Sequence, residues 1–360
     1  MATTPVNLDI TDLLATSARL TWEEAVTLQA LIAALFGAAE AGAFYVPKPV
    51  VDGIQALFQD SAGTTAVTVD GDPVGLMLDQ SGNAVDALQA TSAARPVYKV
   101  TPDRLLLDKV DDALIITVPT GGWTGTMVLA TDQGTASYGV SIPAGAYELG
   151  GQYFPGTAIV GTLFRNGALT AGEKADAEGY FVGNGATASY GAVSNFSSYW
   201  RGRSEITSFP LIDTSSAINL TVTWLFCSSL TSFPLIDTSN VAYFPDTWNG
   251  CTSLLSFPLI DASSGLSFTN TWRTCTSLAS FPANFFDNIK GGNLDGAFTN
   301  TNLDEASIDG ILVSLVTSSI DSGTRVFDQA GGSAPSVGTG QPAIDTLRSR
   351  GWTIVVTGGY

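Results

Sequence analysis

A segment of 24 residues repeats along the second half of the chain, and this period constrains the fold more than any other feature. Phenylalanine followed by proline recurs at Phe209, Phe233, Phe257 and Phe281. The same interval separates the tryptophans Trp200, Trp224, Trp248 and Trp272, and the cysteines Cys227, Cys251 and Cys275. Repeats of roughly 20 to 30 residues are typical of leucine-rich-repeat solenoids, in which each coil supplies a short strand and a looser return segment.

Stacked coils would place equivalent side chains about 4.8 Å apart, the spacing of neighbouring strands. We therefore expect residues 196–290 to form a solenoid. Its buried ladders should contain the tryptophans, the cysteines, the Phe-Pro phenylalanines and both apolar residues of each Leu-Ile-Asp triplet. A single coil could not bury these side chains alone.

The three cysteines allow two interpretations, a metal or redox ladder or a column of small apolar side chains. Thiolate metal sites need several convergent ligands, and the chain contains no histidine that could complete one. An odd number of cysteines also argues against a closed disulfide framework. We favour the apolar column, and we expect no metal or cofactor.

A row of aspartates, Asp213, Asp237 and Asp261, follows the same period. Stacked carboxylates repel each other unless a cation or hydrogen bonds compensate them. A calcium ladder is one interpretation. We favour the other, in which each aspartate accepts a backbone N–H from the residues that follow it and caps a turn.

Composition excludes several functional classes. The net charge of −18 repels nucleic-acid backbones and anionic bilayer surfaces, so we expect no nucleic-acid partner. The absence of histidine excludes Ser-His-Asp and Cys-His catalysis. No apolar run is long enough to span a membrane and no signal peptide is recognisable, so we expect a chain made in the cytoplasm without membrane insertion.

The repeat unit WNGCTSLLSFPLIDASS resembles the BspA-type leucine-rich repeats of bacterial surface proteins and phage tail fibres. The stretches NTNLDEASIDGILVSLV and GTGQPAIDTLRSRGWTIVVT resemble the segment that closes such arrays. Within this α/β capping region, residues 291–360, we expect a helix over 304–318, a loop rich in Gly and Ser, a helix over 344–350 and a strand over 352–357.

Residues 51–190 combine short apolar runs with turns rich in Gly, Asp and Thr, which predicts a β-sandwich-like domain. The motifs GDPVG, LDQSGN and ARPVY resemble the opening of concanavalin-like or laminin-G-like modules. The segments LIITVPT, TGTMVLAT, YGVSIPAG and FPGTAIVGTLFRNG are expected strands. Thr170 and Glu173 predict a helix that begins with a capping box.

Residues 1–50 are expected to form a short helical segment, with helices over 8–20 and 21–41. Thr21 and Glu24 match a capping box, and Leu28, Leu31 and Leu35 recur at helical spacing. This segment either packs on its own domain or attaches and oligomerises the protein. The resemblance to tail fibres implies a homotrimer.

The chain is thus expected to have a mainly β fold, and the resemblance implies a structural and receptor-binding protein of a phage tail, located in the virion. Its expected partners are other tail proteins and a host surface receptor, expected to be a glycan. The alternatives are a bacterial adhesin with the same repeats or a glycan depolymerase, because glycoside hydrolysis needs only two carboxylates. The candidate carboxylates are Glu173, Asp176, Glu178 and Glu205, but they form no diagnostic pattern, so no enzyme is expected.

Between the ladders, each coil contains a stretch whose residues differ from coil to coil. We predict receptor contact at Tyr243, Asp246, Ser267 and Asn270, which would alternate outward from an extended segment. Phe244 and Phe268 share the 24-residue interval, and we expect them to face the core instead.

Overall fold

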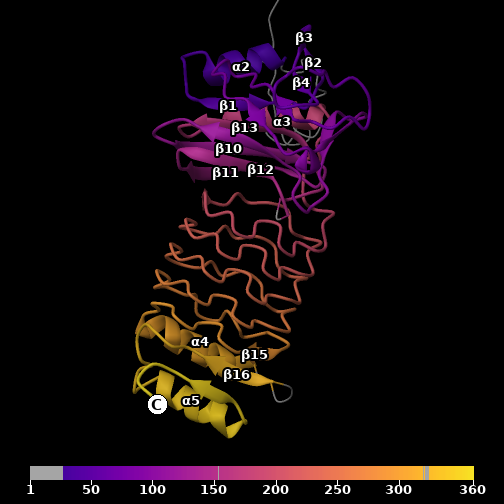
Figure 1. Ribbon diagram of the computed structural model, residues 1–360. Coiled ribbons are helices and arrows are strands. Elements are labelled where there is room, and N and C mark those ends of the chain that lie inside the picture. The colour runs from indigo at the N-terminus through magenta and orange to yellow at the C-terminus, as the bar shows by residue number, and fades with distance from the viewer. Residues whose placement is uncertain (1–26, 153, 319, 321–323) are drawn as a thin grey trace, which may run out of the picture.

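The computed structural model describes residues 27–152, 154–318, 320 and 324–360. The protein is mainly β and elongated (Figure 1). Antiparallel sheets form one end, irregular coils that lie side by side form the middle, and two helices with a small sheet form the C-terminal end (Figure 1). Within the described part of the chain, no helix has the length and apolar character needed to cross a bilayer.

The first described helix, α2 (Leu28–Phe36), begins at Thr27, whose hydroxyl accepts the N–H of Ala30, and ends before Gly37. It is shorter than the helix expected over 21–41. The expected helix over 8–20 and the Thr21–Glu24 capping box lie outside the described residues. The helical segment expected up to residue 50 also ends early, because β1 (Gly42–Tyr45) pairs with a strand of the main sheet.

The main sheet is antiparallel and contains strands from both ends of the β region and from the first repeat. Its order is β14 (Ile206–Ser208), β11 (Thr135–Ile142), β10 (Trp123–Thr131), β13 (Ala158–Asn166), β8 (Arg104–Leu106) and β7 (Val97–Lys99), with β1 also paired to β13. All four strands expected over residues 114–167 are present, three of them here and one in the second sheet.

The second antiparallel sheet has the order β12 (Gly145–Gly150), β9 (Ala113–Val118), β6 (Ala87–Leu88), β5 (Leu76–Met77) and β4 (Leu57–Phe58). A two-stranded ribbon, β2 (Val50–Val51) and β3 (Ile54–Gln55), and a 3₁₀ turn, η1 (Ser92–Ala94), complete this region. Met127 of the main sheet and Ile116 of the second sheet belong to one buried cluster. The two sheets therefore share a core.

Helix α3 (Ala171–Gly183) covers the other face of the main sheet. Its buried residues Ala177 and Phe181 join Val128 and Leu163 in a second apolar cluster, which also contains the buried face of α2. The expected capping box at its start is confirmed, because Thr170 Oγ1 accepts the N–H of Glu173 and the Glu173 carboxylate accepts the N–H of Thr170.

From residue 195 onward, equivalent positions of successive repeats lie side by side. Parallel bridges join Asn195 to Asn219, Asn219 to Tyr243, Tyr243 to Ser267 and Ser267 to Asn293. Backbone N–H groups also donate from one coil to the next, as from Trp224 to Thr247 at 2.9 Å. The repeats therefore satisfy their backbone groups through their neighbours, as stacked coils must.

The strand expected in each coil is absent from residues 209–291, where the coils are joined by single-residue bridges. The backbone explains this difference. Each coil contains a proline, which cannot donate to a ladder. A second interruption is a residue in the left-handed region: Val222, Asp246 and Asn270 have φ of 52°, 53° and 54°. Such residues end an extended segment.

The aromatic residues form two adjacent columns through the coils. The four repeat tryptophans are fully buried, and their rings stack at centroid distances of 5.6, 5.5 and 5.9 Å with interplanar angles of 1–7°. The column continues onto Phe298, 5.0 Å from Trp272, where the interval is longer than 24 residues. The Phe-Pro phenylalanines stack beside it at 5.7–6.0 Å.

One expected ladder is wrong. Both apolar residues of each Leu-Ile-Asp triplet were expected inside, but only the isoleucines Ile212, Ile236 and Ile260 are buried. The leucines Leu211, Leu235 and Leu259 are 72%, 62% and 54% exposed. Neighbouring residues of an extended backbone point to opposite sides, so one of each pair must face outward.

The C-terminal region packs against the last coil with α4 (Glu305–Ser318), α5 (Gly340–Ser349) and a parallel sheet of β15 (Gly292–Leu294), β16 (Arg325–Asp328) and β17 (Thr353–Val355). The bounds of α4, α5 and β17 agree with the ranges expected from the sequence to within a few residues. Strand β16 was missed, because it lies in the segment expected to be a loop. Ser307 and Ser314 of α4 accept the N–H groups of Phe281 and Phe286.

Candidate functional site

The bridged row from Asn195 to Asn293 lies on one edge of the coils and contains two of the four predicted contact residues. Tyr243 is 46% exposed, while Ser267 is half-buried. The row reads Asn, Asn, Tyr, Ser, Asn from coil to coil, whereas the tryptophan column keeps one residue type through the repeats. The bridged row therefore varies from coil to coil, whereas the tryptophan column does not.

The other two predicted residues, Asp246 and Asn270, lie three positions further along each coil. Their left-handed backbone contradicts the extended segment on which the prediction rested. Both are half-buried, and both side chains turn back to their own coil. Asp246 accepts a hydrogen bond from Asn249 Nδ2 at 2.8 Å, and Asn270 accepts one from Arg273 Nη1 at 3.4 Å.

Phe244 and Phe268 face the core, as expected. Both are fully buried, and their rings stack at a centroid distance of 5.0 Å. They add a third aromatic column beside the tryptophans. Tyr243 is the one aromatic residue among the five of the bridged row, and its side chain is exposed.

The aspartates of the Leu-Ile-Asp triplets cap turns, as we favoured. The Oδ1 atoms of Asp213, Asp237 and Asp261 each accept the N–H of the serine two residues later at 2.8–3.0 Å. Hydrogen bonds from Ser215 and Ser239 lower the pKa of Asp213 and Asp237. All three carboxylates are exposed, so water also separates their charges.

The cysteines lie in the apolar interior. All three are fully buried, and each thiol donates to a tryptophan carbonyl of the preceding coil at 3.1–3.3 Å. Burial raises the pKa of Cys251 well above its ordinary value, and that of Cys275 to about 12. Protonated thiols are neither nucleophiles nor good metal ligands at neutral pH.

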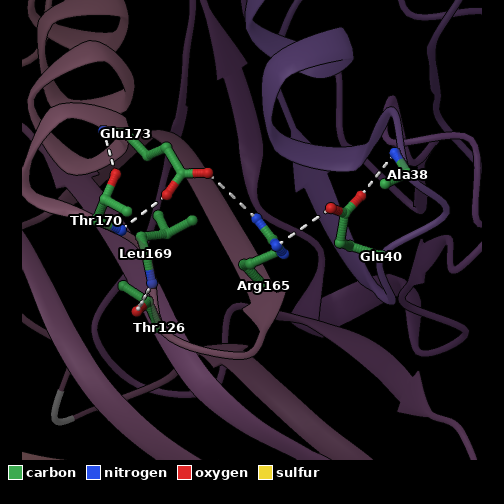
Figure 2. Close-up of polar contacts among 7 residues, drawn as sticks. All are labelled: Ala38, Glu40, Thr126, Arg165, Leu169, Thr170 and Glu173. Carbon is green, nitrogen blue, oxygen red and sulfur yellow. Dashed lines mark hydrogen bonds and ion pairs between the residues drawn. The ribbon is translucent and has the colours of Figure 1, made fainter.

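One carboxylate proposed for catalysis, Glu173, has a structural partner. Figure 2 shows Arg165 of β13 between Glu40, which follows α2, and Glu173 at the start of α3. The Arg165 guanidinium lies 3.4 Å from the Glu40 carboxylate and 3.6 Å from that of Glu173. The N–H and hydroxyl of Thr170, with Arg165, lower the pKa of Glu173, so this group does not act as a general acid near neutral pH.

Glu205 is likewise engaged, at the junction between the sheets and the first coil. It lies 2.7 Å from Arg203 Nε and accepts a hydrogen bond from the Tyr147 hydroxyl at 3.1 Å. Arg203 also donates to that hydroxyl and lies over the Tyr147 and Phe154 rings. This largely buried cluster ties β12 to the first repeat.

The remaining carboxylates of that proposal lie on α3. Asp176 is exposed, whereas Glu178 is half-buried and accepts a hydrogen bond from Ser137 Oγ at 2.6 Å. These four carboxylates therefore do not form one site: Glu205 belongs to a different junction from the three on α3.

Among the described residues, one group of carboxylates is close enough to share a cation. Oxygens of Asp108, Asp111 and Asp112 lie within 4.8 Å of one another. The Asp108 carboxylate accepts the N–H groups of Val110, Asp111 and Asp112, and these bonds, with the Val110 N–H first, lower its pKa. The hydrogen bonds of this turn therefore account for the position of the Asp108 carboxylate without a bound cation.

No protein-family model, curated protein or solved structure matches the chain.

Proposed function

We propose that the protein is a structural and receptor-binding component of a phage tail. In this proposal the coils form a leucine-rich-repeat solenoid, residues 51–190 a β-sandwich-like module and residues 291–360 a cap. The proposed partners are other tail proteins and a host surface glycan, and the proposed location is the virion.

One observation carries this proposal: the bridged row varies between coils, while the tryptophan column and the Phe-Pro phenylalanine column keep one residue type. A rigid stack whose exposed row differs from coil to coil can present an extended recognition surface. Tyr243 supplies an exposed ring of the kind that stacks on sugars. Ser267 and Asn219 lie next to it through bridges and supply hydrogen-bonding groups.

The test is adsorption of fluorescently labelled protein to a panel of encapsulated and unencapsulated bacterial strains. Replacing Tyr243 and Ser267 by alanine should weaken adsorption with an unchanged melting curve, because neither is buried and neither has the left-handed backbone that alanine disfavours. Leu259→Ser, which alters another exposed edge, is the control. Unchanged adsorption of a normally folded double variant would remove this row from recognition, and failure of the wild type to adsorb to any strain would contradict the proposal as a whole.

The trimeric state is part of the proposal and is tested separately. Deleting residues 1–45 would remove β1, which pairs with β13, and would disturb the sheet itself. Deletion of residues 1–26 leaves α2 and β1 in place. We expect light scattering to find three chains per particle for the full chain and fewer for the truncated one. Three chains per particle in both would refute the role of that segment.

A further inference from the structure

A polar groove lies beside the main sheet, between α3 and the first coil. In β11, Ala136 and Tyr138 face the inner core, so Thr135, Ser137 and Gly139 face the opposite side. These outward residues line the floor of the groove, whose volume is about 670 Å³. Small-molecule sites commonly have volumes of about 300–1,000 Å³.

The two walls come from segments far apart in the sequence. Lys174 and Glu178 of α3 line one side, and residues 208–213 of the first repeat line the other. Strand β14 holds the second wall in place, because Ser208 pairs with Gly139 of β11. A Cβ atom at position 139 would lie 2.3 Å from Ser208 Oγ, so glycine allows this hydroxyl to lie over the strand.

A carboxylate projects from each wall, and serine hydroxyls orient both. Ser137 Oγ donates to Glu178 at 2.6 Å, and Ser189 Oγ donates to Asp213 at 3.3 Å. Asp213 is also bound by Ser215, so its carboxylate is held from two sides. Oriented carboxylates are strong acceptors for hydroxyl groups, and such pre-arrangement lowers the entropy lost on binding.

The charge of the groove selects the class of ligand. Two carboxylates face one lysine, and the whole chain carries −18, so an anionic ligand is repelled. Serine and threonine hydroxyls offer both donors and acceptors. The exposed Leu211 and the neighbouring Pro210 provide an apolar rim. A molecule with many hydroxyls, apolar ring faces and no negative charge matches all three properties.

We propose that this groove binds an uncharged oligosaccharide, with Glu178 and Asp213 accepting hydrogen bonds from its hydroxyls. This inference rests on the proposed function, since it assigns a second glycan-binding surface to a receptor-binding protein. It differs in location, because the groove lies at the junction of the sheet and the first coil rather than on the bridged row.

The experiment measures binding of the full chain to an array of neutral, amino-sugar and acidic bacterial oligosaccharides. Ala175→Trp places a large ring in the groove from an exposed position of α3. Gly172→Trp on the same helix points into open space and is the matched control. Asp213→Asn keeps the turn cap and removes the charge, and Asp237→Asn makes the same change one coil further on, outside the groove.

We expect the wild type to bind neutral oligosaccharides, and both Ala175→Trp and Asp213→Asn to weaken that binding about tenfold or more. The two controls should bind as the wild type does. Equal binding by all variants, preference for acidic sugars or no binding to the array would overturn the groove assignment. Adsorption of the wild type to bacterial cells, measured in parallel, shows whether the proposed function survives that result.

Discussion

The Cys251 thiol donates a hydrogen bond to the Trp224 carbonyl oxygen of the preceding coil, 3.3 Å away. The same oxygen accepts the N–H of Cys227 at 3.1 Å, so one carbonyl joins the turn of its own coil to the side chain of the next. Cys227 and Cys275 repeat the thiol contact with Trp200 and Trp248. The cysteine column therefore links coils through hydrogen bonds as well as through packing.

Replacing Cys251 by serine should lower the free energy of unfolding by about 1–3 kcal/mol, because it places a more polar group in an apolar corner. A hydroxyl also lies closer to the backbone than a thiol and so further from the Trp224 carbonyl. Trp248→Ala removes a ring stacked on two others and should cost about 3–5 kcal/mol. Cys251→Ala should cost less than Trp248→Ala. Urea unfolding followed by circular dichroism would rank the stabilities of the three variants. A serine variant as stable as the wild type would contradict the interpretation that Cys251 lies in an apolar environment.

The native cysteines should resist chemical labelling. Because burial keeps all three protonated and inaccessible, a bulky maleimide at neutral pH should label none of them within minutes. The same reagent in guanidinium should label all three, as mass spectrometry would count. Rapid labelling of the folded protein would show that the stack opens.

The exposed leucines should contribute little to stability. Leu235→Ser should change the free energy of unfolding by less than about 0.5 kcal/mol, because that side chain is 62% exposed. Leu254→Ala removes a fully buried side chain and should cost about 2–5 kcal/mol. Thermal melts of the two variants would show whether the exposed and the buried leucines differ in this way. Similar losses of stability in both variants would show that Leu235 makes a buried contact.

Stability should fall in acid. The folded chain lowers the pKa of Asp213 and Asp237 through hydrogen bonds from Ser215 and Ser239. A lowered folded pKa stabilises the fold above the unfolded value of about 3.9, and this contribution is lost as the pH falls through the folded pKa. We therefore expect a flat melting temperature above about pH 5 and a decline below about pH 4. The double variant Asp213→Asn with Asp237→Asn should decline less steeply, and an identical decline would exclude these two groups.

We expect no glycoside hydrolysis. Arg165 lies beside Glu173 and Arg203 lies beside Glu205. Hydrogen bonds from Thr170 lower the pKa of Glu173, whereas a general acid in glycoside hydrolysis needs a raised pKa. Incubation with the polysaccharides to which the protein binds should release no new reducing ends. Release of reducing ends by the wild type but not by Glu178→Gln would instead favour the alternative that the protein is a glycan depolymerase.

Local features of the fold could be predicted from the sequence because they depend on neighbouring residues. The Thr170–Glu173 capping box and the aspartate turns need only a few consecutive side chains with suitable donors and acceptors. The period of 24 likewise identifies which side chains meet, since an equal interval brings equal positions together in a stack.

The tertiary structure decided the features that depend on backbone direction and on distant pairing. Asp246 and Asn270 have a left-handed backbone, and the side chains of these two predicted contact residues turn back to their own coil. Leu211 and Ile212 lie on opposite sides of the backbone, so Leu211 is exposed and Ile212 is buried. The groove exists only because β14 pairs with β11, across more than 60 residues. The sequence determined which residues stack, because that depends on their interval, but only the folded chain decided which surfaces remain open, because those depend on contacts that no local pattern records.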